Sequence, residues 1–469
     1  MKKLLLITFM AAFSVALTAQ EFVEIWSHYG DNAPEWFTDG TEADIYDPSF
    51  SASERGIVYN PVDGYLYVAS RHGEDSYGDE ALDRGEPHVY VLDPETGEAP
   101  AFGLSKLLTT GITSADQNYG GGYPLNNVTV DESGRIFACN MTLASGADIV
   151  GSDGVITYKA FRVYHWSWQQ DIPQMVVDYK DGGYRLGDKF SVIGNWETQA
   201  YIYAGAGGTS KMLRWSVTAG VVSETPDIIS LKDIEGAGTS PTVAPVPDKD
   251  DWMYVSGKGF LPTLFTTDGT NLSQIAITAA NLPSSVIAGR TIEFGGRTLM
   301  AMFSGDQSAF ILDLSKHGEN VTDADIIGWT PTFGTKYDNA YGEGAVEFGI
   351  IDDELYVYIC APSNGVACYR IDGLIGINSK EVTNEYNVSA YPNPAIDFTN
   401  IQYTLPDNAT GALSVKLFDI TGKFMSITVD RAHGGQQEMK INTSELTTGT
   451  YLYQVVYNNK ISKGKLLVK

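Results

Sequence analysis

The protein has 469 residues, which is more than one simple hydrophobic core usually holds, so several domains or a radially repeated architecture are expected. Its formal net charge of -27 at pH 7 disfavours nucleic acid and anionic membrane surfaces as partners, because both are themselves negatively charged. Cations, basic proteins and neutral glycans remain open as partners.

The first 19 residues have the pattern of a secretory signal peptide. Lys2 and Lys3 precede an apolar run over residues 4–17, and Ala19 offers a small residue for cleavage. This run is too short to span a bilayer as a helix, and no later segment has the roughly 18 apolar residues that a spanning helix needs. Residues 1–19 are therefore predicted to be removed on export, and no transmembrane segment is predicted in the mature chain.

Between residues 22 and 374 the chain consists of short Val, Ile, Tyr and Phe runs bounded by Gly, Asp, Asn and Pro, which is typical of an all-β fold. One unit, a strand followed by a tight turn and a second strand, occurs six times, beginning at Gly56, Asn127, Phe190, Thr242, Thr291 and Glu347. Third strands follow at His88, Phe161, Met212, Thr263, Phe310 and Ala367. Fourth strands follow at Met175, Asp227, Gln274 and Asp325, with a weaker one at Ala101. Such repeats of four antiparallel strands predict a six-bladed β-propeller over residues 20–376.

The sixth copy ends near Leu374 without a fourth strand. Residues 22–28, FVEIWSH, are strand-like and precede the first copy, so they are predicted to supply the missing strand and to close the last blade. An open blade would expose unpaired backbone groups, which makes such closure favourable. If residues 22–28 lie elsewhere, the ring is open or has seven blades.

In this strand order the loops between second and third strands share one face with the crossings between blades, and long loops on a rigid scaffold often carry binding residues. The candidate ligand-binding residues on this loop-rich face are Arg55, Arg71, His72, Asn126, Arg185, Asp188, Arg290 and Glu343. The guanidinium groups could grip a carboxylate or phosphate through paired hydrogen bonds. In so acidic a body they could equally pair with neighbouring Asp and Glu side chains, and both interpretations stay open.

No sequence motif identifies a catalytic residue. AGAGGTS at residues 204–210 leads into a strand rather than a helix, so it is not a dinucleotide fingerprint, and HExxH, paired CxxC, GxSxG and complete EF-hand motifs are absent. DPETG at Asp93 is interpreted as a tight turn rather than an acidic site. No cofactor is evident, the catalytic and metal-binding residues are unknown, and Ca²⁺ is the metal that would suit an acidic body.

The three cysteines could form one disulfide after export. Cys360 and Cys368 flank a predicted hairpin, ICAPSNGVACY. A three-residue loop over residues 363–365 would place the two cysteines opposite each other and allow a disulfide, whereas a two-residue Asn-Gly turn would place them on opposite faces of the sheet. Cys139 has no evident partner and is interpreted as a buried small hydrophobic residue.

The end of the chain differs from the body in charge and pattern. Residues 377–387 are polar and are interpreted as a linker, and the short alternating strands over residues 388–469 predict a small antiparallel β-sandwich. Residues 387–469 contain eight Lys or Arg against six Asp or Glu, so the acidic excess lies in the body.

The elements YPNPA, LFDITGK, INTSEL, GTYLYQV and GKLLVK, in this order, closely resemble the C-terminal sorting domain of cargo for the type IX secretion system of the phylum Bacteroidetes. The resemblance covers residues 388–469 and implies recognition by the type IX secretion machinery after Sec export. It also implies that this domain is usually removed, and that the body is released or attached to surface lipopolysaccharide. The sorting-signal residues that match are Tyr391, Pro392, Asn393, Pro394, Gly464 and Lys465.

The body patterns ERGIVYNPVDGYLYVASR and LNNVTVDESGRIFACNMT resemble an uncharacterised family of exported propellers in the same phylum, which supplies no catalytic residues. The sequence therefore predicts a secreted or cell-surface propeller that binds a glycan, a peptide or another macromolecule through its loop-rich face. The alternative is a propeller enzyme, either a calcium-dependent phosphatase or a glycan hydrolase or lyase. A purely structural role in the surface layer is a third hypothesis.

Overall fold

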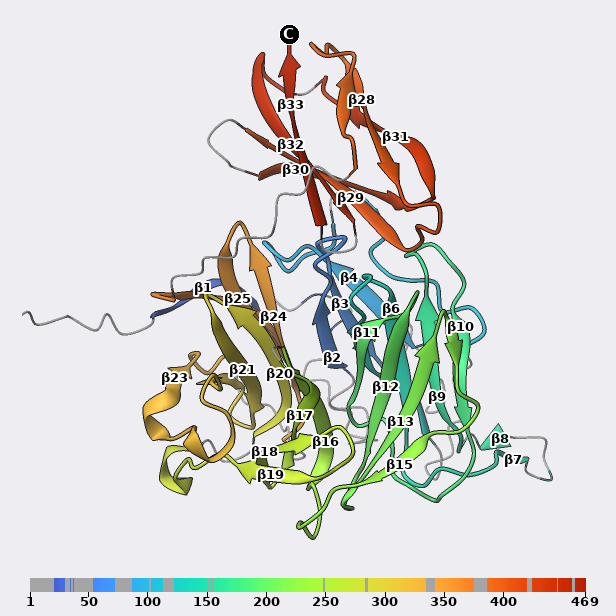
Figure 1. The fold of residues 1–469 in the computed structure, drawn as a ribbon, viewed down its shortest axis with the longest axis vertical. Helices are drawn as coiled ribbons and strands as arrows, with labels where there is room; N and C mark the ends of the chain where they lie inside the picture. Colours follow the sequence, from blue (N-terminus) through green and yellow to red (C-terminus); the bar gives the residue numbers. More distant parts are fainter. Residues whose placement is uncertain are drawn as a thin grey trace, which may run out of the picture.

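The computed structural model is all-β in its described part, with antiparallel sheets and short 3-10 helices (Figure 1). The described residues are 21–29, 34, 37, 54–71, 87–100, 103–112, 122–150, 152, 156–157, 159–247, 249–282, 286–334, 342–374, 386–419, 424–444, 446–457 and 460–469. The 3-10 helices among them are η3 (Ala279–Asn281), η4 (Gly318–Asn320) and η5 (Asp323–Asp325). Within these residues no helix is long and apolar enough to cross a membrane.

The first half of the body forms three antiparallel sheets, called sheets 1 to 3 here. Sheet 1 contains β2 (Glu54–Tyr59), β3 (Leu66–Ser70) and β4 (His88–Leu92). Sheet 2 contains β5 (Gly122–Val130), β6 (Ile136–Thr142), β9 (Phe161–Trp166) and β10 (Gln174–Tyr179), and the small pair β7 (Ile149–Val150) and β8 (Ile156–Thr157) lies in one of its loops. Sheet 3 contains β11 (Phe190–Asn195), β12 (Gln199–Ala206), β13 (Lys211–Thr218), β14 (Val221–Val222) and β15 (Asp227–Ser230). Ala101, where the weak fourth strand was expected to begin, lies outside the described residues, and further along the chain Lys106 forms an isolated bridge with Tyr90.

The second half of the body repeats this organisation in sheets 4 to 6. Sheet 4 contains β16 (Thr239–Val246), β17 (Lys249–Lys258), β18 (Phe260–Thr266) and β19 (Asn271–Gln274). Sheet 5 contains β20 (Val286–Phe294), β21 (Arg297–Ser304), β22 (Ser308–Asp313) and β23 (Ile326–Trp329). Sheet 6 contains β24 (Ala345–Ile351), β25 (Glu354–Ala361), β26 (Gly365–Asp372) and β1 (Glu21–His28).

The N-terminal strand β1 lies where the sequence predicted it, at the open edge of the last sheet. It pairs antiparallel with β26, from Glu21 opposite Asp372 to His28 opposite Val366. The indole Nε1 of Trp26 donates a hydrogen bond of 2.9 Å to the Pro94 carbonyl, which ties β1 to the neighbouring sheet 1 as well.

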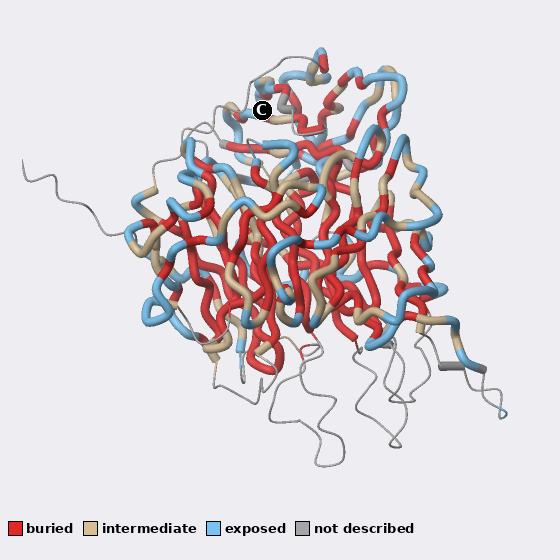
Figure 2. Tube along the Cα trace, turned by 60° about the horizontal axis from the view of Figure 1, so that its bottom comes forward, coloured by how far each residue is buried: buried red, intermediate tan, exposed pale blue. Residues whose placement is uncertain are grey.

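The hydrophobic core of the body is divided among the spaces between neighbouring sheets. Within the described residues, one buried cluster lies between each pair of successive sheets, including the pair formed by sheets 6 and 1. The first strands also contact one another in the order β2, β5, β11, β16, β20, β24 and back to β2. Each large apolar side chain in these clusters contributes about 1.5–3 kcal/mol through burial, and Figure 2 shows the buried segments gathered in the middle of the body.

The tight turns between strands form as their sequences predicted. In NPVDG, Asn60 Oδ1 accepts a hydrogen bond of 3.1 Å from the Val62 amide. In DPETG, Asp93 Oδ1 accepts one of 2.8 Å from the Glu95 amide, so the interpretation of this segment as a turn is confirmed. Gly134, in the next such turn, has a φ of +80° and packs so closely on Val62 that a Cβ atom would lie 2.6 Å from the Val62 Cβ.

The hairpin with the two cysteines has a register that neither sequence hypothesis described. Ala361 pairs with Gly365, so the loop covers residues 362–364, Cys360 lies opposite Val366, and Cys368 lies opposite Tyr358. The disulfide that the three-residue loop would have allowed is therefore not formed in this structure, in which both buried thiols are free. Within this loop Ser363 has a φ of +61°, in the left-handed region. Cys139 is buried in an apolar cluster, as expected.

The C-terminal residues form two further antiparallel sheets around a core of their own. One contains β27 (Ser389–Tyr391), β28 (Phe398–Leu405) and β31 (Gly435–Asn442). The other contains β30 (Phe424–Arg431), β29 (Ala412–Asp419), β32 (Gly449–Tyr457) and β33 (Lys460–Val468). Figure 1 shows these strands, in orange and red, at one end of the body.

Candidate functional site

Five of the polar residues predicted for the loop-rich face lie in or before the first strands of the sheets. Arg55 is in β2, Asn126 in β5 and Arg290 in β20, while Asp188 precedes β11 and Glu343 precedes β24. Arg290 is partly buried and the other four are buried. Because the first strands contact one another in a cycle, residues far apart in the sequence are brought to the middle of the body.

Lys189, which the sequence analysis did not select, links several of these residues. Its Nζ donates a hydrogen bond of 2.9 Å to the Arg55 carbonyl, and only 2% of the residue is exposed. Burial lowers the pKa of Lys189 to about 8, the Glu343 carboxylate acts in the opposite direction, and the charges of Arg55 and Arg290 lower it further. The sequence could have indicated Lys189, because side chains alternate between the two faces of a strand and Lys189 therefore shares a face with Ser191.

A second group of hydrogen bonds fixes the neighbouring residues. Arg71 Nε donates a hydrogen bond of 2.7 Å to Asn126 Oδ1, and Asn126 Nδ2 donates to the carbonyls of Gly187 at 2.7 Å and Asp188 at 3.2 Å. The Arg185 guanidinium grips Asp188 with two hydrogen bonds of 2.6 and 2.5 Å. The linked residues, called the central cluster below, are Arg55, Arg71, Asn126, Arg185, Asp188, Lys189, Arg290 and Glu343.

Arg290, in sheet 5, connects the central cluster to sheets 6 and 3. Its Nε lies 3.3 Å from Glu347 Oε2, and its Nη1 donates a hydrogen bond of 3.2 Å to Ser191 Oγ. Burial raises the pKa of Glu347 to about 7, and the charge of Arg290 opposes this rise. An arginine that already holds a carboxylate and a hydroxyl presents fixed donors rather than a mobile charge.

The central cluster therefore combines both interpretations of the arginines. Arg185 and Arg290 pair with carboxylates, as the acidic body suggested, yet the side chain of Arg185 is 33% exposed and lies where a ligand could reach it. His72 lies outside the described residues. Trp166 is fully buried and belongs to the core. Across the described part of the chain, no group of three His, Cys, Asp or Glu side chains is placed to hold a metal ion.

The predicted sorting-signal residues come together at the far end of the C-terminal sheets. Asn393 Nδ2 donates a hydrogen bond of 2.8 Å to the Lys465 carbonyl, and Asn393 Oδ1 accepts one of 2.8 Å from the Leu467 amide. The YPNPA segment thus lies along the last strand, with Tyr391 72% exposed. Gly464 faces Tyr453 across the sheet, and a Cβ atom at this position would lie 2.1 Å from the tyrosine ring.

Comparison with known families identifies this C-terminal part. The model of the secretion system C-terminal sorting domain matches residues 389–469. Residues 389–469 are a sorting domain of this family. The resemblance drawn from YPNPA to GKLLVK is thereby confirmed, and the sorting domain follows a region, residues 109–254, that matches a domain of unknown function, DUF8500. A search of curated proteins gave no match.

Among solved structures, a DUF4623 family protein from Bacteroides eggerthii is similar to this chain at 14% identity and a TM-score of 0.52, over 76% of this chain and 75% of that one. This likeness concerns the fold alone. Trypanosoma rangeli sialidase matches at 9% identity and a TM-score of 0.38, over 95% of this chain and 89% of that one. A Bacteroides ovatus protein described as xyloglucan PUL GH43B matches at 11% identity and a TM-score of 0.30, over 73% and 89% of the two chains. The TM-scores of the sialidase and GH43B matches are too low to support a conclusion about this chain.

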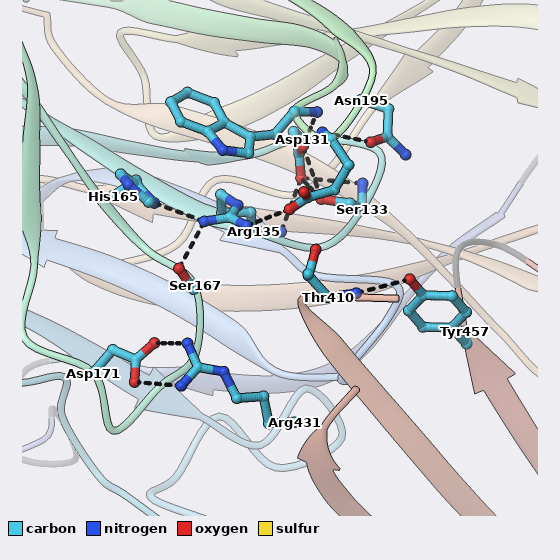
Figure 3. A network of polar contacts seen from close by, with 12 residues as sticks. Asp131, Ser133, Arg135, His165, Ser167, Asp171, Asn195, Thr410, Arg431 and Tyr457 are labelled. Atoms are coloured by element: carbon cyan, nitrogen blue, oxygen red, sulfur yellow. Dashed lines mark hydrogen bonds and ion pairs between the residues drawn. The ribbon is translucent and has the colours of Figure 1, made fainter. Parts of the chain in front are cut away.

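The sorting domain contacts the face of the body that carries the tight turns. Ser414 Oγ donates a hydrogen bond of 2.8 Å to the Val62 carbonyl in the β2–β3 turn. Arg431 donates two hydrogen bonds, of 3.3 and 2.7 Å, to the carboxylate of Asp171 in the β9–β10 turn (Figure 3). The described loops between second and third strands lie at the opposite ends of the strands from these turns.

The turn beside this contact is held by a polar network (Figure 3). Arg135 Nη1 donates hydrogen bonds of 2.7 Å to Ser167 Oγ and 3.1 Å to His165 Nδ1, and Arg135 also pairs with Glu197. Burial lowers the pKa of His165 to about 4, and the charge of Arg135 lowers it further, so the imidazole is neutral and can accept this hydrogen bond. The sorting domain thus rests on a rigid part of the body.

Replacing Arg431 by Glu is expected to loosen the contact between sorting domain and body. The variant loses an exposed ion pair, usually worth about 0.2–1 kcal/mol, and places two carboxylates together at Asp171. Hydrogen–deuterium exchange of the amides in residues 60–65 should become faster, while exchange in the cores of both parts stays unchanged. Lys440→Glu is the control, because Lys440 packs on Phe398 within the sorting domain. Equal amide exchange rates of residues 60–65 in Arg431→Glu and Lys440→Glu would contradict a stabilising contact between Arg431 and Asp171.

Proposed function

We propose that the six sheets of the body are the blades of a six-bladed β-propeller over residues 20–376. The cycle of contacts among the first strands supports this, as does the presence of a hydrophobic cluster between each pair of successive sheets, sheets 6 and 1 included. Strand β1 would complete the sixth blade. Residues 377–387 would act as a linker to the sorting domain, and residues 1–19 as a signal peptide that is removed on export.

The protein is exported cargo of the type IX secretion machinery, and the sorting domain is the observation that carries this proposal. After Sec export and passage across the outer membrane, the body is secreted or held at the outer surface, where surface lipopolysaccharide is the anchor we propose. The exposed Tyr391 and the YPNPA segment beside Gly464 and Lys465 form the surface that the machinery would recognise.

At the cell surface the body binds a macromolecule, a glycan or a peptide, through the loop-rich face above the central cluster. The observation that supports binding is the organisation of this cluster, in which Arg71, Asn126 and Arg185 are fixed by short hydrogen bonds before any ligand arrives. A preorganised polar floor lowers the entropy cost of recognition. Ca²⁺ at this face stays a prediction.

The test is binding of the full chain to a glycan array and to immobilised lipopolysaccharide. Arg185→Ala should weaken binding at least about tenfold, which corresponds to about 1.4 kcal/mol. The affinity of Arg185→Lys should lie between those of the unchanged protein and Arg185→Ala, because lysine keeps the charge and loses the paired hydrogen bonds. Arg297→Ala is the control, since Arg297 pairs with Asp313 near the β20–β21 turn. Binding that is equal in Arg185→Ala and the control would exclude this site.

One observation favours the alternative, a propeller enzyme. Lys189 and Glu347 have pKa values moved to about 8 and about 7 by burial, and such groups gather at catalytic sites. The same preparations should therefore be assayed against p-nitrophenyl phosphate and p-nitrophenyl glycosides, with Ca²⁺ or with a chelator. Turnover that disappears with the chelator and in Lys189→Met would select the enzyme over the binding protein.

A further inference from the structure

Sheets 6 and 1 meet at a seam where strands from the two ends of the body lie together, called the closing seam here. Across it β2 contacts β24 and β25, and its buried core includes Trp26, Tyr59 and Tyr358. The rings of Tyr59 and Tyr358 stack with their centres 5.9 Å apart. Strand β1 also reaches the turn after β4, where His28 Nε2 lies 2.6 Å from the Thr96 carbonyl oxygen. Because no described strand pair joins the two sheets, side-chain contacts hold the seam closed.

Three carboxylates lie at the end of the closing seam that carries the tight turns. Asp63 is in the β2–β3 turn and Glu95 in the turn after β4, both on sheet 1, whereas Asp352 is in the β24–β25 turn of sheet 6. Burial raises the pKa of Glu95, and the negative charges of Asp93 and Asp352 raise it further. Burial likewise raises the pKa of Tyr59 in the seam, and the charges of all three carboxylates add to this rise. Like charges thus face each other across the seam and oppose its closure.

Lys416, in strand β29 of the sorting domain, is a cation that acts on all three of these carboxylates. Its charge lowers the pKa of each one, against the effect of burial. Side chains two residues apart lie on the same face of a strand, and on this face of β29 the Ser414 hydroxyl donates its hydrogen bond to the Val62 carbonyl, next to Asp63. Lys416 is half-buried. The sorting domain therefore brings a positive charge to the end of the closing seam.

Two further contacts hold β29 and β30 on the body. Val429 lies opposite Ser414 in the pairing of these two strands and packs against the apolar cluster between sheets 1 and 2. Arg431 holds Asp171 in the β9–β10 turn of sheet 2. The sorting domain is thus anchored on sheets 1 and 2, while the charge of Lys416 also acts on sheet 6.

We propose that the sorting domain clamps the closing seam while it is attached to the body. Lys416 offsets the repulsion between the carboxylates of sheet 1 and sheet 6, and the contacts of Ser414, Val429 and Arg431 keep it in place. Removal of the domain takes this charge away and leaves the three carboxylates facing one another. The seam then opens more often, so the exported chain is more tightly closed than a body from which the sorting domain has been removed.

The cysteines allow the opening of the seam to be measured directly. Cys360 and Cys368, called the seam cysteines here, are free thiols buried in the cluster of the closing seam, whereas Cys139 is buried in the cluster between sheets 2 and 3. A buried thiol reacts with N-ethylmaleimide only when the structure around it opens. Labelling of the folded protein, followed by mass spectrometry of its peptides, gives the reaction rate of each cysteine. Cys139 is the internal control for opening elsewhere in the body.

The first test replaces the cation in the full-length protein. In Lys416→Glu the labelling rates of the seam cysteines should rise at least about threefold, which is within the range of an exposed ion pair, while the rate of Cys139 stays unchanged. Lys440→Glu is the matched control, because it makes the same charge change within the sorting domain, where Lys440 packs on Phe398. Adding Asp352→Asn to Lys416→Glu should bring the rates back toward those of the unchanged protein, because one of the repelling charges is then removed.

The second test removes the domain. A protease site introduced within residues 377–385 allows the folded full-length protein to be cut and the body to be purified. In this body the seam cysteines should again react at least about threefold faster than in the uncut protein, with Cys139 unchanged. Equal rates in the body and the uncut protein would overturn the proposal, and so would equal rates in Lys416→Glu and Lys440→Glu. Faster labelling of all three cysteines together would also overturn it, because the loosening would then not be confined to the seam.

Discussion

Glu343→Gln is expected to lower the free energy of unfolding of the body by about 3–5 kcal/mol at pH 7, because it removes a buried carboxylate whose charge favours the buried, protonated Lys189. Glu343 exerts the strongest of the charge effects that favour protonated Lys189, and both residues are buried. Urea denaturation followed by tryptophan fluorescence measures the effect on the body alone, since all eight tryptophans lie before residue 330 and none lies in the sorting domain.

The loss in Glu343→Gln should become smaller as the pH rises from 7 to 10. The folded-state pKa of Lys189 is about 8, below its ordinary value of 10.5, so above pH 8 the folded protein increasingly holds a neutral lysine that does not need the carboxylate. Lys189→Met combined with Glu343→Gln should cost less than the single change, because no charge is then left unpaired. Glu319→Gln, an exposed change, should alter the free energy of unfolding by no more than about 0.5 kcal/mol. If Glu343→Gln is as stable as this control, the Glu343 carboxylate does not stabilise the fold through Lys189.

Gly464→Ala is expected to block export of the protein in the bacterium that produces it. The added Cβ would lie 2.1 Å from the ring of Tyr453, which is only 2% exposed and cannot move without disturbing the core of the sorting domain. Overpacking of this kind costs about 1–3 kcal/mol, a large loss for so small a domain. Immunoblots of periplasm, cell surface and medium should show the variant retained in the periplasm.

The control for this variant is Gly449→Ala on the neighbouring strand β32. There a Cβ would meet only ordinary contacts of 3.8 and 3.9 Å, so export should be unchanged. Normal export of Gly464→Ala would show that the domain tolerates the clash and that this glycine is dispensable for sorting. Equal retention of both variants would point to a general sensitivity of the domain to substitution.

The repeat of the body could be predicted from sequence because each strand pair is a local feature. Turn residues such as Asn60 and Asp93 satisfy nearby amides, and alternating apolar residues mark the buried faces. The pairing of residues 22–28 with the last sheet could be predicted as well, since the sixth copy lacked a strand. The sorting domain was recognisable because several separate motifs occur in the right order.

The features that could not be predicted from the sequence depend on the relative placement of distant segments or on the conformation of a single turn. The hairpin loop covers residues 362–364 instead of the expected 363–365. This shift of one residue changes the cross-strand partner of Cys360 from Cys368 to Val366. Lys189 gains its character from Arg55 and Glu343, which lie on other sheets.

The pairing of β1 with β26 also constrains the order in which the chain can fold. A chain that enters the periplasm N-terminus first presents β1 at once, whereas its partner Gly365–Asp372 arrives only after the remaining sheets. Closure is therefore a late, long-range step, of the kind that slows folding and leaves an unpaired edge exposed in the meantime. The sorting domain comes after β26 in the sequence, so a chain that displays a complete sorting signal has already delivered the last segment needed to finish the body. A chain that stops short of β26 also lacks the sorting domain, so export by way of this signal would exclude it.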